Sequence, residues 1–163
     1  GRAGAGARWW RACGVGGGVE GGMACAEAGI RVGVLAGVSP GTAGPELAGS
    51  PLTHRGISQG FTVITGHAPP DDPRNTVRWE ALAEAGTTLV VLMGVENLAS
   101  IVGTLAKAGL DGHTPLACLM DIGLHSQKVR LRTLSTILVS GPPTGLRPPA
   151  VIVIGAVVDF ARR

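Results

Sequence analysis

The chain has 163 residues, of which 45% are hydrophobic, 15% are charged and only 3% are aromatic, and its formal net charge is +3. This length suits one ordinary domain, and the apolar content suits strands of Val, Leu, Ile and Ala covered by helices. Basic residues do not alternate with aromatic ones, so a nucleic-acid-binding surface is not expected. No run of about 18 apolar residues is present, which argues against a transmembrane helix.

The cysteines and histidines do not form a recognisable metal or disulfide pattern. Cys13, Cys25 and Cys118 are widely spaced and lack a Cys-x-x-Cys motif. An odd number of cysteines without a recognisable signal peptide favours reduced thiols in the cytoplasm. The four histidines share no ligand spacing with one another or with the cysteines, so no metal site is predicted.

Residues 1–22 stand apart, because glycine and arginine dominate and no hydrophobic period can be recognised. We expect this segment to be poorly ordered, or to be an aberrant stretch from a shifted reading frame. It contains a formal Gly16-x-Gly18-x-x-Gly21 match, but no predicted strand precedes it as a dinucleotide site requires. The ordered part of the chain is expected over residues 23–163.

From Met23 onward, short apolar segments alternate with helical patterns and with glycine or proline turns. Thr87–Met93 is dominated by apolar residues and predicts a central strand, whereas Glu96–Ala108 has its apolar residues on one helical face. The predicted helices are 23–28, 76–85 and 96–108, with one or two helical turns in 39–47. The predicted strands are 30–35, 61–65, 87–93, 115–120 and 150–158, with a strand edge at 129–131 and either helix or strand at 134–139. This alternation predicts an α/β domain.

Several strings, taken together and in order, are specific to one family. They are Ala24–Ile30, Ala36–Ser39, Pro51–Gly56, Thr65–His67, Leu92–Gly94 and Arg147–Gly155. They resemble the linker and C-terminal domain of the S-adenosylmethionine (SAM)-dependent tetrapyrrole methylases, and in particular the members that methylate uroporphyrinogen III. The resemblance covers about residues 20–163.

The resemblance implies a mixed five-stranded sheet flanked by helices, with the first domain of the family largely missing from this chain. It implies methyl transfer from SAM to carbons 2 and 7 of uroporphyrinogen III, giving precorrin-2, in a cytoplasmic homodimer. With half of the SAM cleft absent, the chain is expected to be inactive by itself. The alternatives are a non-catalytic dimerisation module derived from the family and a methylase of a later corrin intermediate. The Pro51–Gly56 string favours the uroporphyrinogen enzyme over the latter.

The resemblance also assigns roles to particular residues. Ser39, Met93 and Ala117 match positions that contact SAM. Arg55 matches a position facing the substrate carboxylates, and Glu20 aligns with a catalytic-site glutamate near the substrate. Three of these assignments have a purely structural alternative: Met93 as a core methionine, Ala117 as a packing residue, and Arg55 as half of a surface ion pair.

Overall fold

The structure is a computed structural model that describes residues 18–33 and 37–162. The chain divides into two units, residues 1–39 and 40–163. In the first unit, helix α1 (Gly18–Glu27) is followed by Gly29, whose φ of 70° is that of a glycine C-cap. The predicted end of this helix is confirmed, but its predicted start at Met23 is too late. Glu20 lies in the first turn, where a negative charge favours the helix dipole.

Two further expectations fall on the first unit. The predicted strand 30–35 is wrong over residues 30–33, which form no strand, and the rest of it lies outside the described residues. A strand needs a partner for its backbone N–H and C=O groups, and these residues have none in the described part of the unit. The segment predicted to be poorly ordered is 1–22, and most of it, residues 1–17, also lies outside the described residues.

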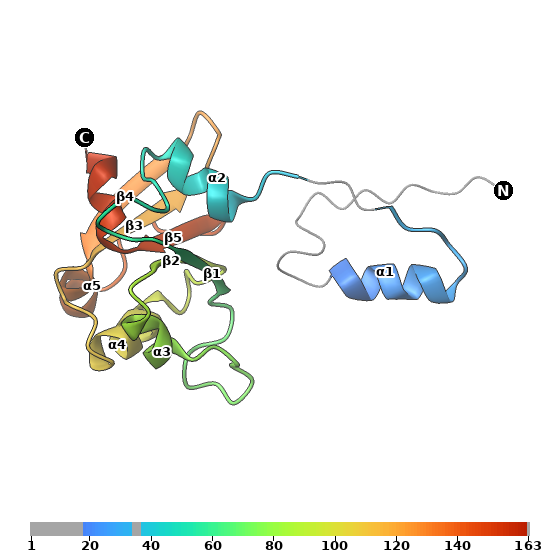
Figure 1. Ribbon diagram of the computed structural model, residues 1–163, viewed down its shortest axis with the longest axis horizontal. Coiled ribbons are helices and arrows are strands. Elements are labelled where there is room, and N and C mark those ends of the chain that lie inside the picture. Colours follow the sequence, from blue (N-terminus) through green and yellow to red (C-terminus); the bar gives the residue numbers. More distant parts are fainter. Residues whose placement is uncertain (1–17, 34–36, 163) are drawn as a thin grey trace. The chain divides into compact units, whose positions relative to one another are not determined.

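The second unit is built around one five-stranded sheet, as predicted. Its elements are α2 (Pro40–Leu47), β1 (Phe61–Thr65), α3 (Trp79–Glu84), β2 (Thr88–Leu92), α4 (Leu98–Lys107), β3 (Pro115–Met120), β4 (Lys128–Thr133), α5 (Leu134–Ser140), β5 (Ala150–Ile154) and the 3-10 helix η1 (Ala156–Arg162). The strand order is β1-β2-β5-β3-β4 (Figure 1). Strands β1, β2 and β3 run in one direction, and β4 and β5 run against them. The segment predicted to be the central strand forms β2, which is an internal strand of the sheet, but the strand in the middle is β5.

The two faces of the sheet are covered by different helices (Figure 1). Alternate residues of β2, β3 and β5 pack with α3, α4 and α5 in one core. Its members are Trp79, Leu89, Val91, Leu98, Ile101, Val102, Leu105, Leu116, Cys118, Leu134, Ile137, Ile152 and Ile154. The intervening residues of these strands face the side of α2 and η1.

Some element boundaries differ from the prediction for local reasons. Helix α3 begins at Trp79 rather than Thr76, because the side chain of Asn75 closes the preceding loop instead of capping a helix. Its Oδ1 accepts from the Val77 N–H at 2.8 Å, and its amide donates to two carbonyls earlier in the loop. Strand β5 ends at Ile154 rather than residue 158, because Gly155 has a φ of 144°, which side chains disfavour.

Other segments agree with the prediction or decide between the alternatives that it left open. Residues 40–47 form the eight-residue helix α2 despite Pro45 within it, and Pro40 occupies the first helical position, which proline favours. Residues 134–140 form helix α5, whose first turn is capped by the hydroxyl of Thr133, which accepts from the Thr136 N–H. The predicted strand edge at 129–131 extends over Lys128–Thr133 as β4.

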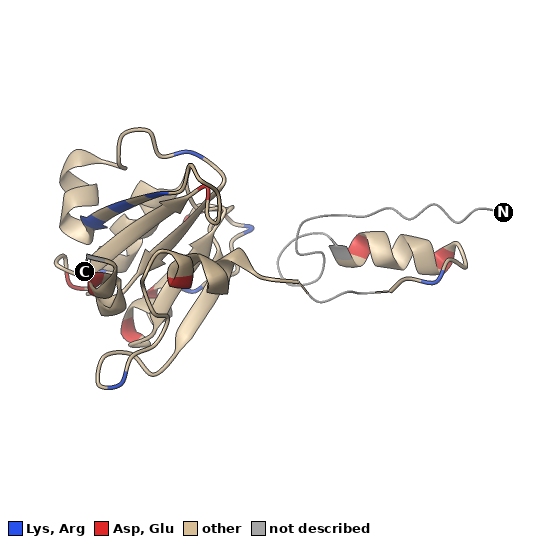
Figure 2. Ribbon diagram, turned by 90° about the horizontal axis from the view of Figure 1, so that it is seen from above, with Lys and Arg blue, Asp and Glu red and all other residues tan. Residues whose placement is uncertain are grey.

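Strand β4 is an edge strand with basic residues at alternate positions (Figure 2). Lys128, Arg130 and Arg132 pair in register with Met120, Cys118 and Leu116 of β3. Charged side chains along a sheet edge oppose pairing with the edge of another chain. Over residues 18–33 and 37–162, no helix is long and apolar enough to cross a membrane.

Cys118 has no exposed surface in β3, and this burial raises the pKa of its thiol from an ordinary value of 9.0 to about 12. We expect native protein at pH 8 to leave Cys118 unlabelled by iodoacetamide while the half-buried Cys25 reacts. Peptide mass spectrometry would detect the difference, and equal labelling of both would contradict it. Because the unfolded thiol ionises first, the free energy of unfolding should also fall as the pH rises above about 9.

Candidate functional site

Strands β1, β2 and β3 end at the same edge of the sheet, and open α/β sheets commonly bind ligands outside such carboxyl ends. The turns after β1 and β2, Thr65–His67 and Leu92–Gly94, lie in direct contact. The Gly66 N–H donates to the carbonyl of Leu92 at 2.8 Å. A Cβ on Gly66 would lie 2.8 Å from the Gly94 Cα, so this approach requires glycine.

Asn97 connects these two turns. Its side-chain amide donates to the carbonyl of Gly66 at 2.8 Å and to that of His67 at 3.0 Å. The same side chain makes no capping bond to α4, although it precedes that helix directly. In the sequence, an asparagine just before a helix looks like an ordinary cap, so the pattern gives no sign of this role.

Met93 leaves β2 in an unusual conformation. Its φ is 55°, a left-handed value that non-glycine residues rarely adopt, and its side chain is 47% exposed. Residues held in such conformations are concentrated at ligand-binding and active sites. The alternative in which Met93 is a core methionine does not fit this exposure.

Replacing Met93 with glycine should relieve the left-handed strain and raise the free energy of unfolding by about 0.5–1 kcal/mol. The same change should weaken any ligand contact that the methionine makes at this edge. Urea denaturation measures the first effect, with Met93→Ala as a control that keeps the strain. A clear loss of stability in the glycine variant would mean that the methionine side chain is needed for packing.

The turn after β3 is held by an ion pair. Asp121 has a φ of 52°, and its Oδ2 accepts from Arg147 Nη2 at 2.6 Å. The side chain of Asp121 is only 9% exposed, whereas that of Arg147 is 57% exposed. Since Arg147 lies shortly before β5, the pair ties the end of β3 to the start of β5 at the edge that carries Met93. Nothing in the sequence predicted this pairing.

An open pocket of about 260 Å³ lies beside the end of β1, lined by Thr65, His67, Ala68, Arg74, Asn75, Thr76 and Val77. Arg74 donates from Nε and Nη2 to the carboxylate of Asp72, at 2.9 and 2.6 Å. These hydrogen bonds hold the pKa of Asp72 at about 2. The charge of Arg74 is therefore balanced within its own loop.

Arg55 lies at the other edge of the sheet. It is exposed, in a turn between His54 and Ser58 that precedes β1. The Ser58 hydroxyl accepts from the N–H of Thr88, the first residue of β2. The His54 ring stacks on Phe160 of η1, the element that follows β5. Both contacts lie where β2 begins and β5 ends.

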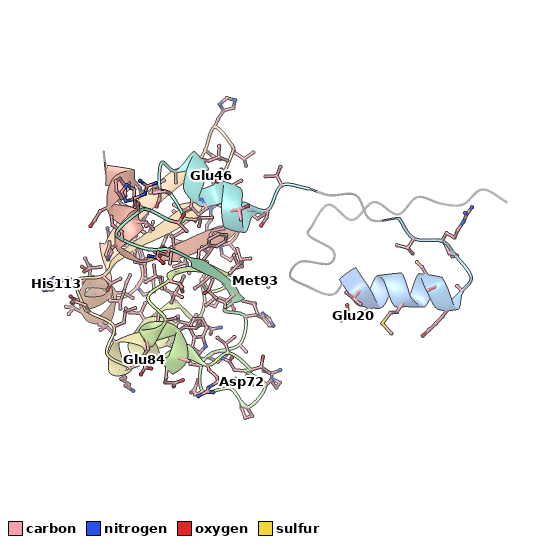
Figure 3. The ribbon with its side chains drawn as sticks, viewed as in Figure 1. Glu20, Glu46, Asp72, Glu84, Met93 and His113 are labelled. Atoms are coloured by element: carbon pink, nitrogen blue, oxygen red, sulfur yellow. The ribbon has the colours of Figure 1, made fainter. Side chains whose placement is uncertain are left out.

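The two edges are well separated. Thr88 and Met93 are five residues apart along extended chain, which corresponds to roughly 16 Å. Figure 3 labels His113, just before β3, and Met93, just after β2, at opposite ends of the sheet. The structure therefore does not bring Arg55 and Met93 together. Among the described residues, Arg55 forms no salt bridge with a carboxylate.

The remaining predicted site residues lie elsewhere. Ala117 is in the middle of β3 with no exposed surface, on the face of the sheet that α2 and η1 cover. Ser39 is half-buried and directly precedes the first helical residue of α2. Glu20 is exposed in α1, within the first unit of the chain. Across residues 18–33 and 37–162, no three His, Cys, Asp or Glu side chains are placed to hold a metal ion.

Sequence comparison identifies the family. The family described as Tetrapyrrole (Corrin/Porphyrin) Methylases matches residues 15–138. The chain belongs to this family. Among curated tetrapyrrole methylases, the uroporphyrinogen-III C-methyltransferase of Pseudomonas aeruginosa is 42% identical over 132 residues, which are 81% of this chain and 53% of that protein. The Synechocystis enzyme of the same name is 40% identical over 134 residues, covering 82% and 51%.

Solved structures of tetrapyrrole methylases share the fold. The uroporphyrin-III C-methyl transferase of Thermus thermophilus, crystallised with S-adenyl homocysteine, superposes with a TM-score of 0.76 at 28% identity. The match covers 90% of this chain and 60% of that one. The chain thus spans about half the length of the curated relatives that it matches.

Proposed function

We propose that this chain forms the C-terminal wall of the cofactor site in a SAM-dependent C-methyltransferase that acts on uroporphyrinogen III. The observation that carries the proposal is Met93, which leaves β2 in a left-handed conformation with 47% of its surface exposed. The names of the relatives at 42% and 40% identity support the substrate. The S-adenyl homocysteine complex of the Thermus thermophilus enzyme supports the cofactor.

The residues at the carboxyl edge suit a cofactor of this kind. When bound, SAM supplies an electrophilic methyl group for a pyrrole carbon. Met93 would place its apolar side chain against the cofactor. The Gly66 N–H bonds to the carbonyl of Leu92 beside Met93, and the Asn97 side chain in turn donates to the carbonyl of Gly66. Methyl transfer requires the reacting atoms to be aligned about 3 Å apart, so a turn fixed by close packing is useful there.

Ser39 and Ala117 are the other proposed cofactor contacts. Ser39 could offer its hydroxyl and backbone at the start of α2. Ala117 has no exposed surface, so its contact would require the layer over that face of the sheet to move aside. A contact between Ala117 and a ligand therefore needs a movement of the structure, whereas Met93 is already exposed.

Arg55 and Glu20 are proposed to act on the substrate. The planar guanidinium of an arginine matches a carboxylate bidentately, and uroporphyrinogen III carries several carboxylates. Because Arg55 lies at the edge opposite Met93, we assign it to carboxylates remote from the carbon that receives the methyl group. Glu20 would assist the loss of the proton from that carbon.

We also propose that this chain by itself does not complete the reaction, because it spans about half the length of its curated relatives. In the intact enzyme it would form part of a cytoplasmic homodimer. A family-derived dimerisation module without catalysis is the alternative. Light scattering of the purified chain addresses it: a stable dimer that does not bind S-adenosylhomocysteine would favour the module.

Calorimetric titration of the chain with S-adenosylhomocysteine tests the cofactor site. Weak binding is expected, and Met93→Asp should abolish it by placing a charge against the cofactor. Leu138→Asp is the matched control, since Leu138 is 51% exposed on α5. Equal binding by all three proteins would argue against a cofactor contact at Met93.

A further inference from the structure

The backbone around Arg55 forms a short, well-defined turn. The His54 N–H donates to the carbonyl of Ser58, and the N–H groups of Ile57 and Ser58 both donate to the carbonyl of His54, each at 3.0 Å. Gly56 supplies the left-handed residue with a φ of 78°. The side chain of Arg55 therefore projects from a turn whose two ends are joined by backbone hydrogen bonds.

Two serines attach this turn to the body of the unit. The hydroxyl of Ser58 donates to the carbonyl of Gly60 at 2.9 Å and accepts from the N–H of Thr88 at 3.2 Å. The hydroxyl of Ser50, a residue that is 1% exposed, donates to the carbonyl of Val157 in η1 at 3.2 Å. The segment that carries Arg55 is thus fastened to β2 on one side and to η1 on the other.

Phe160, in η1, contacts the first residue of the turn. Its ring stacks on the His54 ring with a centroid distance of 4.6 Å and an angle of 26° between planes. The Nδ1 atom of His54 lies 2.9 Å from the carbonyl oxygen of Arg55. A carbonyl oxygen can only accept, so Nδ1 carries the proton and donates. The stack therefore fixes the ring that holds the backbone of Arg55.

We infer that Phe160 is a positioning residue, which orients Arg55 for an anionic, polycarboxylate ligand through the His54 ring. The C-terminal 3-10 helix, far from Arg55 in the sequence, then controls how that cation is presented. The functional half of this inference rests on the role of Arg55 given under Proposed function. The structural half stands on the contacts of His54 with Phe160 and with the Arg55 carbonyl, and can be measured without any ligand.

The structural half is tested by amide hydrogen exchange on the full chain. Phe160→Ala should accelerate exchange at Ile57 and Ser58 by about two- to tenfold, the range expected for losing one aromatic stack. The amide of Gly66, at the opposite edge, should be unchanged and so reports on global unfolding. Phe160→Tyr keeps the ring and should exchange like the wild type. Unchanged exchange at Ile57 and Ser58 in Phe160→Ala would overturn the inference.

The nitrogen chemical shifts of His54 give a second readout that simple destabilisation would not move. Neutral wild-type His54 should be the Nδ1–H tautomer, and Phe160→Ala should shift it toward the Nε2–H form that free histidine prefers. Phe160→Tyr should retain the wild-type pattern. A wild-type protein in the Nε2–H form would contradict the hydrogen bond to Arg55.

Titration with uroporphyrin, a stable polycarboxylate tetrapyrrole, tests the functional half. Arg55→Ala and Phe160→Ala should both weaken binding, the latter by about two- to tenfold, and Leu138→Ala should not. If Arg55→Ala weakens binding and Phe160→Ala does not, the positioning role is wrong and the proposed function stands. If Arg55→Ala binds like the wild type, the proposed role of Arg55 fails, and the functional half fails with it.

Discussion

Replacing Gly66 with alanine should lower the free energy of unfolding by about 2–3 kcal/mol, the cost of overpacking a close contact. The new Cβ would lie 2.8 Å from the Gly94 Cα, 2.8 Å from Val91 Cγ1 and 2.9 Å from Ile101 Cδ1. The first of these neighbours is backbone and cannot rotate away. The turns after β1 and β2 would have to separate, which would also disturb Met93.

Urea denaturation measures this effect, and Gly103→Ala is the matched control. Gly103 lies inside α4, where an added Cβ would meet nothing within 4 Å. Alanine there should raise the free energy of unfolding by about 0.5–1 kcal/mol, because glycine is a poor residue in a helix interior. If Gly66→Ala were as stable as Gly103→Ala, the two turns would not be in the contact described.

Replacing Arg147 with methionine should cost about 2 kcal/mol, since it removes a charge-assisted hydrogen bond and leaves a desolvated carboxylate. The acid concerned is Asp121, whose side chain is 9% exposed and accepts from Arg147 at 2.6 Å. Adding Asp121→Asn should restore part of the lost stability, because the uncompensated charge disappears.

Arg74→Met is the control for this experiment. Arg74 makes an equally short ion pair with Asp72, at 2.6 Å, but the Arg74 and Asp72 side chains are 85% and 13% exposed, against 57% and 9% for Arg147 and Asp121. Solvent screens an ion pair this exposed, so its loss should have a small effect on the midpoint of urea denaturation. Similar losses in the Arg74 and Arg147 variants would show that the lower exposure of the Asp121–Arg147 pair makes no difference to its contribution.

The sequence predicts the parts of the fold that depend on local pattern. The apolar run of β3 predicts its observed bounds, and the periodicity around Leu98 and Ile101 predicts helix α4. The sequence does not predict the start of α3, because the Asn75 side chain bonds to a loop rather than to a helix. The predicted strand at 30–35 failed because the described residues there lack a neighbouring strand.

In the candidate site, too, the sequence predicts some features and misses those that depend on contacts between distant residues. The resemblance drew attention to Met93, but not to its conformation, which depends on the contact between two glycine turns. Asp121 and Arg147 are 26 residues apart, so their pairing depends on β3 and β5 being neighbours. The separation of Arg55 from Met93 likewise follows from strand direction, which composition and spacing do not reveal.

We propose that this chain carries one wall of a methyl-transfer site and does not complete the reaction by itself. Incubating the purified chain with SAM and uroporphyrinogen III, and measuring methylated tetrapyrrole by mass spectrometry, tests this proposal. We expect no methylated product, together with S-adenosylhomocysteine binding that depends on Met93. Catalytic turnover to a dimethylated product by the chain alone would contradict it.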